Sequence, residues 1–135
     1  MGGWLAGNAN AMWRLTFTSI LVLSLLPGDT PESEIGSSWV WNFGHVPAYA
    51  VLAGTTLLAL SRRGPVDRWV RWRTGMALVS LAVALELLQP LVGRTASAAD
   101  VGYGALGAVV GMWIQAVIAR RLQTEAAKRD ARNGC

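Results

Sequence analysis

Several polar side chains of this sequence lie inside or at the edge of long apolar segments, where such groups are costly and usually functional. They are Asn42, His45, Glu86, Gln89, Arg94, Ser97 and Asp100. Glu86 and Gln89 are three residues apart and therefore share a face of a helix. An arginine together with carboxylates, a histidine and an amide suits the binding of a phosphate or sugar–phosphate head group. We therefore predict a ligand-binding site formed by His45, Glu86, Gln89, Arg94 and Asp100.

Two chemical interpretations of these residues stay open. In a binding protein, Arg94 anchors the anion, and an ion pair with Glu86 or Asp100 holds its guanidinium in place. In an enzyme, His45, Glu86 and Asp100 are the catalytic candidates, with His45 as general base acting on a lipid head group. The sequence has no Ser–His–Asp order with supporting glycines, no phosphate-cradling loop and no HExxH motif. No reaction class is indicated, and we favour binding.

Each candidate also has a structural interpretation. Ser97 and Asp100 have the spacing of a helix-capping box, in which Asp100 would also be favoured by the helix dipole. A Glu86–Arg94 pair could fasten the short turn between two helices. His45 could be a hydrogen-bonded packing residue. On these interpretations the polar residues would only hold the fold together.

The elements that position these residues are four apolar segments. They cover about residues 11–27, 39–60, 74–92 and 98–119, and each approaches or exceeds the roughly 17 residues that a membrane span requires. The segments lack the polar stripe at 3.6-residue spacing that a soluble helical bundle shows. No small-x-small cleavage site follows the first segment, so we expect it to remain as an uncleaved span. The sequence predicts an all-α fold, with residues 1–135 forming one four-helix transmembrane domain.

The distribution of basic residues gives the expected orientation. Ten of the twelve Lys and Arg residues lie in residues 61–73 or in the tail 120–135, and Arg14 lies near the start of the first segment on the same expected side; the exception is Arg94. Loops rich in Lys and Arg stay in the cytoplasm, so we predict cytoplasmic N and C termini. This distribution explains the net charge of +4 better than nucleic-acid binding does, and the expected partners are membrane lipids.

One cysteine, Cys135, and one histidine are too few for a structural zinc site, so we predict no metal and no cofactor.

This topology places the polar candidates at a common level. The second segment runs inward and the third outward, so all the candidates fall in the outer third of the membrane.

In the fourth segment, Gly104, Gly107 and Gly111 present small side chains. Small residues at this spacing let another helix approach closely, either within this chain or from a second copy or another partner in a membrane complex. We assign these glycines to helix packing.

The segment from Glu86 to Asp100 resembles the VanZ-like family of bacterial membrane proteins. The matching residues are Glu86-Leu87-Leu88-Gln89-Pro90, then Gly93-Arg94-Thr95-Ala96-Ser97, Asp100 and the pair Gly107 and Gly111. Upstream, His45-Val46-Pro47-Ala48-Tyr49 is similar to the family's histidine-bearing helix. The chain has Trp41-Asn42 where the family often has Asp-Lys, and Gly104 where an asparagine often occurs.

The resemblance implies a cell-envelope protein of the bacterial cytoplasmic (inner) membrane. The founding member of the family is associated with teicoplanin resistance, and relatives are linked with surface polysaccharides. We therefore expect an accessory or binding role toward a lipid-linked or envelope glycan or phosphate ligand. Two alternatives stay open, namely a hydrolase or transferase acting on a lipid head group, and a structural subunit of an envelope complex.

Overall fold

The computed structural model describes residues 2–25 and 37–133, and side chains within 8–25 and 44–133. These residues form four α-helices and a short 3-10 helix. They are α1 (Gly2–Leu25), α2 (Ser37–Ser61), α3 (Arg68–Leu88), η1 (Gln89–Val92) and α4 (Ala98–Asn133). No strand occurs in these residues, which confirms the all-α prediction for the described part of the chain.

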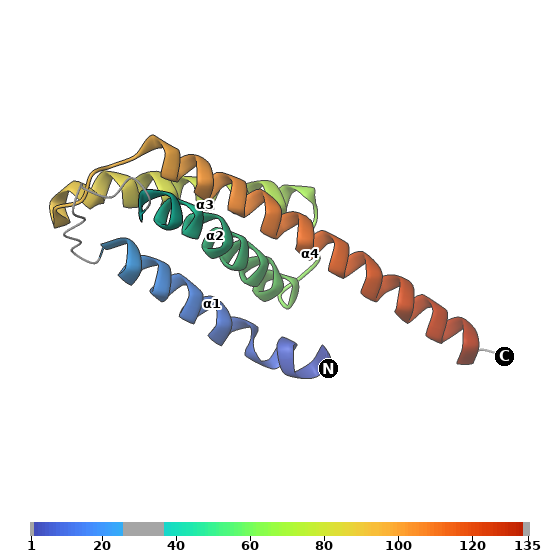
Figure 1. Cartoon of the computed structure of the whole chain (residues 1–135). Helices are drawn as coiled ribbons and strands as arrows, with labels where there is room; N and C mark the ends of the chain where they lie inside the picture. Colours follow the sequence, from blue (N-terminus) through green and yellow to red (C-terminus); the bar gives the residue numbers. More distant parts are fainter. Residues whose placement is uncertain (1, 26–36, 134–135) are drawn as a thin grey trace.

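The helices form an elongated bundle with two distinct ends (Figure 1). At one end lie η1 and the turn that leads into α4, together with the last turn of α1; we call this the η1 end. At the opposite end lie the start of α1 and the loop between α2 and α3, and α4 projects beyond the bundle in the same direction. We call this the arginine end, because the loop carries Arg62 and Arg63.

Three helical segments are long and apolar enough to cross a membrane. They are Gly44–Ser61, Arg68–Val92 and Ala98–Asn133. Large apolar side chains point away from the bundle; Leu87 and Leu91, for example, are 71% and 80% exposed. Such apolar outer surfaces are unfavourable in water and favourable against lipid. The chain therefore has the features of a helical membrane protein, while the predicted span within α1 and the count of four spans stay predictions.

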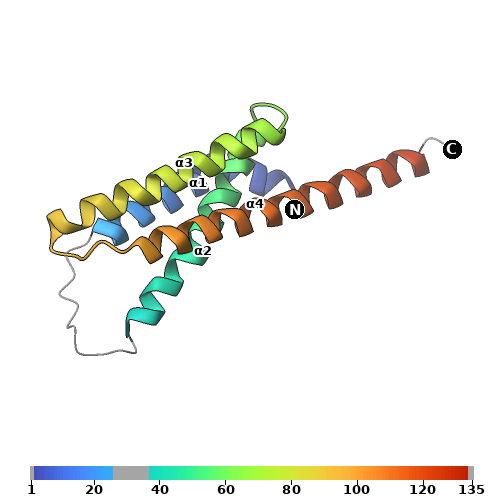
Figure 2. The same ribbon diagram turned by 90° about the horizontal axis from the view of Figure 1, so that it is seen from above.

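Helix α2 lies at the centre of the packing and contacts each of the other three helices. Its residues Tyr49, Leu52 and Ala53 belong to the buried core, together with residues of α1, α3 and α4. Helix α2 crosses α4 obliquely (Figure 2). At this crossing, Gly107 and Gly111 of α4 lie against the backbone of α2. The helix that approaches the glycine-bearing face is thus one of the same chain.

All four helices extend beyond the predicted spans, and α1 already begins at Gly2. Helix α3 begins at Arg68 rather than near residue 74, because the Asp67 carboxylate accepts a hydrogen bond from Val70 N at 2.8 Å and caps the helix. Helix α4 continues through the tail to Asn133, beyond the predicted span that ends near residue 119. The tail side chains are exposed, and this extension is rich in Ala, Arg, Glu and Lys, which favour helix.

Candidate functional site

Three helices bring ionisable side chains together at the η1 end. His45 comes from α2, Glu86 from the last turn of α3 and Asp100 from the first turn of α4. One potential ligand atom from each lies within 4.8 Å of the other two. Glu86 and Asp100 are each only 7% exposed. We call these three residues the His–carboxylate cluster.

Glu86 is held by two hydrogen bonds from uncharged donors. Its Oε2 accepts from Ser97 N at 2.7 Å, and its Oε1 accepts from Gln89 Nε2 at 3.1 Å. Gln89 is 1% exposed, so this amide lies inside the bundle beside the cluster. The Ser97 contact fastens the start of α4 to the end of α3. A carboxylate has about four acceptor positions, so each Glu86 oxygen keeps capacity for another partner.

The chain reverses direction through η1 because of two residues. Pro90 occupies the first turn of η1, and Gly93 follows in the left-handed conformation with φ 78°, which glycine adopts without strain. Arg94 N donates to Gln89 O at 3.1 Å and closes the turn. Asp100 N then donates to Ser97 O at 3.1 Å in the first turn of α4. This compact turn places Asp100 next to the end of α3.

The Arg94 side chain makes a contact that the sequence did not predict. Its Nη1 donates to Leu23 O at 3.3 Å, near the end of α1, where helix carbonyls lack intrahelical donors. Arg94 thus links the turn to α1. The ion pair of Arg94 with Glu86 or Asp100 stays a prediction.

His45 carries a buried nitrogen that the fold does not satisfy. Its Nδ1 has no hydrogen-bond partner within the described part of the chain, so the interpretation of His45 as a hydrogen-bonded packing residue finds no support at this atom. The imidazole stacks on Tyr49, one helical turn further along α2, with 6.5 Å between ring centroids and 25° between planes. A buried polar atom without a partner is unusual in a folded protein and calls for an explanation.

Tyr49 belongs to the site and was not selected from the sequence. It is 2% exposed, and it packs in the notch that Gly104 and Gly107 leave on α4. Its ring belongs to the buried core and also contacts His45, so it joins the His–carboxylate cluster to that core. The available sequence signal was its spacing of four residues from His45, which puts both on one face of α2. Asn42, another polar residue near the site, has its side chain outside the described residues.

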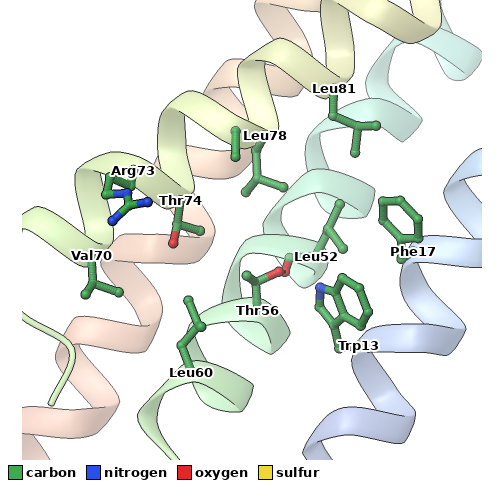
Figure 3. A pocket seen from close by; sticks show the side chains of 11 residues that line it. Trp13, Phe17, Leu52, Thr56, Leu60, Val70, Arg73, Thr74, Leu78 and Leu81 are labelled. Carbon is green, nitrogen blue, oxygen red and sulfur yellow. The ribbon is translucent and has the colours of Figure 1, made fainter. Parts of the chain in front are cut away.

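An open cavity lies elsewhere, between α1, α2 and α3 toward the arginine end (Figure 3). Its volume is about 640 Å³. The lining is mainly apolar, with side chains such as Trp13, Phe17 and Leu52, and with Arg73 near Thr74 on α3. None of the cluster residues lines it. This cavity suits a hydrocarbon chain, whereas the polar chemistry is concentrated at the η1 end.

The fold and the site together define an all-helical protein, with three helices long and apolar enough to cross a membrane and a cluster of His45 with two buried carboxylates at one end. Comparison of the chain with family models, with curated proteins and with solved structures gives no match.

Proposed function

We propose that the chain is a four-span protein of the bacterial cytoplasmic membrane, with both termini in the cytoplasm and the η1 end outside. The arrangement in Figure 1 supports this topology, because the start of α1, the α2–α3 loop and the projecting tail all lie at the arginine end. The α2–α3 loop, the first two turns of α3 and the tail of α4 contain ten of the twelve Lys and Arg residues, and Arg14 lies midway along α1. This distribution is typical of a cytoplasmic face.

We further propose a VanZ-like envelope function, in which the η1 end binds a lipid-linked or envelope glycan or phosphate ligand. The observation that carries this proposal is the convergence of His45, Glu86 and Asp100 from three helices, with both carboxylates buried. Buried ionisable groups in a membrane bundle are retained for function or for specific pairing. The segment that builds the site, Glu86–Asp100, is also the segment that carries the family resemblance.

An enzymatic role of the same cluster is the second candidate, and His45 is the observation that favours it. Its buried Nδ1 has no partner in the described chain, and one of its ring nitrogens lies within 4.8 Å of an oxygen of Glu86 and of Asp100, which is a setting suited to a general base. Release of phosphate or of a head group from a lipid substrate by purified protein, lost in His45→Ala, would support catalysis. Binding of the same lipid without turnover would favour the accessory role.

A role as a structural subunit receives less support from the packing. Gly107 and Gly111 lie against α2 of the same chain, so this glycine-bearing face is covered and does not offer a dimer interface. A homodimer or a larger complex would have to use another surface.

The topology is tested by labelling single cysteines in intact cells. In a Cys135→Ser background, Thr95→Cys reports on the turn at the η1 end and Gly64→Cys on the α2–α3 loop; both positions are exposed. A thiol reagent that cannot cross the bilayer should modify Thr95→Cys directly and Gly64→Cys only after permeabilisation. Direct labelling of Gly64→Cys would refute the proposed orientation and, with it, an outward site.

The envelope function is tested by comparing cells that produce the wild-type chain, His45→Ala or Glu86→Gln. Glu125→Gln is the matched control, because Glu125 is an exposed carboxylate of the tail, 3.3 Å from Lys128. We expect resistance to teicoplanin to depend on both cluster residues and not on Glu125. Equal resistance for all four proteins, at equal membrane levels, would contradict the proposal.

A further inference from the structure

We propose that His45, Glu86 and Asp100 form a binding site for one divalent transition-metal ion. The count of cysteine and histidine residues led to the prediction of no metal. That count applies to structural zinc sites built from Cys and His, whereas a site of mixed ligands needs only one imidazole. The inference deepens the proposed function, because the ion would hold an anionic ligand at the outward site.

The geometry of the three side chains is close to that of a coordination sphere. Their potential ligand atoms lie within 4.8 Å of one another. Ligands at about 2.1 Å from a tetrahedral ion are separated by about 3.4 Å. Side-chain rotations that shorten the longest of these separations by at most about 1.4 Å would therefore suffice. Because the three ligands come from three different helices, the packed bundle itself holds them around the ion.

The electrostatics of the cluster also favour a cation. Two carboxylates that share a buried region of low dielectric repel each other unless a positive charge lies between them. The two hydrogen bonds to Glu86 come from Gln89 Nε2 and Ser97 N, which are neutral. Arg94, the basic residue expected to neutralise Glu86, donates to Leu23 O through its Nη1. A divalent ion bound between Glu86 and Asp100 would supply such a positive charge.

His45 supplies the observation that is independent of the carboxylates. Its Nδ1 is buried and has no hydrogen-bond partner among the described residues. A neutral imidazole offers one nitrogen lone pair to a metal, and histidine is the commonest metal ligand. Coordination of an ion would thus account for the position of the histidine and for an atom that packing alone leaves unsatisfied.

The contacts around the cluster resemble the supporting contacts of known metal sites. Residues that hydrogen-bond to a ligating carboxylate orient it and raise metal affinity, and Gln89 and Ser97 N do so for Glu86. One imidazole and two carboxylates suit ions such as Zn²⁺ or Mn²⁺, since Ca²⁺ prefers oxygen ligands alone and Cu⁺ prefers sulfur. Three protein ligands leave at least one coordination position open, and a phosphate or carboxylate oxygen of a ligand can occupy it.

The first test uses the full-length, tag-free protein in detergent, stripped with a chelator and titrated with Mn²⁺. We expect saturation at one ion per chain and displacement of the Mn²⁺ by Zn²⁺. Electron spin-echo modulation of the bound Mn²⁺ should show coupling to one imidazole ¹⁴N, a signal that requires no variant. Absence of saturable binding, or binding without nitrogen coupling, would overturn the proposal.

The second test assigns the ligands. His45→Gln and Asp100→Asn should each weaken Mn²⁺ binding at least tenfold, whereas Glu125→Gln, which removes an exposed carboxylate of the tail, should leave binding unchanged. Equal affinity in all four proteins would refute the assignment. The outcome is separable from the envelope function. If the protein binds metal but the variants leave resistance unchanged, the metal site is retained and the envelope function is refuted. If the variants lower resistance but the protein binds no metal, the envelope function is retained and the metal site is refuted.

Discussion

Replacing Gly111 by alanine is expected to force α2 and α4 apart. A Cβ built on Gly111 would lie 2.8 Å from both the C and Cα atoms of Ala50, and closer still to Ala50 O. Ordinary carbon–carbon contacts are about 3.5–4.0 Å. All three atoms are backbone atoms of α2, so no side-chain rotation relieves the overlap. The two helices must therefore separate locally by about 1 Å.

The energetic consequence follows from the loss of contact along this crossing. A radial gap of 0.5–1 Å forfeits about a quarter to a half of the van der Waals attraction between the facing atoms. Overpacking of this kind typically costs about 1–3 kcal/mol. Van der Waals packing is also a principal force between helices in a bilayer. We expect Gly111→Ala to lower the free energy of unfolding by about 2 kcal/mol.

Gly102→Ala is the matched control on the same helix. A Cβ at Gly102 would meet no atom within 4 Å, so the change adds only helix propensity, about 0.5–1 kcal/mol in favour of the folded state. The two variants make the same chemical change, one destabilising and the other stabilising, and their unfolding free energies should differ by about 1.5–4 kcal/mol. The measurement is SDS-induced unfolding in mixed micelles, followed by tryptophan fluorescence. Equal stability of the two variants would show that α2 does not approach α4 as closely as described.

Three further changes test the local contacts. Asp67→Ala removes the cap that accepts from Val70 N and should cost about 0.5–2 kcal/mol, measured as faster hydrogen exchange in the first turn of α3. Gln89→Leu removes the donor to Glu86 Oε1 and should weaken Mn²⁺ binding about 10–100-fold in the same titration; unchanged affinity would contradict a positioning role for Gln89. Lys128→Ala breaks an exposed pair and should change the SDS unfolding free energy by less than about 0.5 kcal/mol.

Much of the site was predictable because membrane topology constrains depth. Once the helices alternate in direction, residues at the start of one and the end of the next must lie at the same level. His45, Glu86 and Asp100 satisfy this condition, and the structure brings their side chains together. The role of Arg94 was not predictable in this way. Its contact with Leu23 O joins residues 71 positions apart, and hydropathy does not report how α1 packs against the turn.

Helix ends also depart from the hydropathy pattern for a physical reason. Hydropathy identifies a transmembrane segment by its apolar residues. The helix that contains this segment can be longer, because its ends are set by capping residues. Asp67 caps the start of α3, which lies outside the apolar segment. Because aspartate is a favoured N-cap residue, this start could have been predicted from the sequence. The tail of α4 has no buried residue to reveal it, and only the helix propensity of its residues indicates its conformation.

A substitution at His45 distinguishes a cluster that binds an ion or a ligand from a cluster that only stabilises the fold. Glu86 accepts hydrogen bonds from Ser97 N and Gln89 Nε2, so its loss would damage the turn whether or not the cluster binds anything. His45 has no such bond at its buried Nδ1 among the described residues. Replacing the imidazole therefore removes a possible ligand without removing a hydrogen bond at that atom. If the cluster only stabilises the bundle, His45→Gln should behave as a modest packing change; if it holds an ion, the same variant should lose metal while α3 and α4 remain fastened by Glu86.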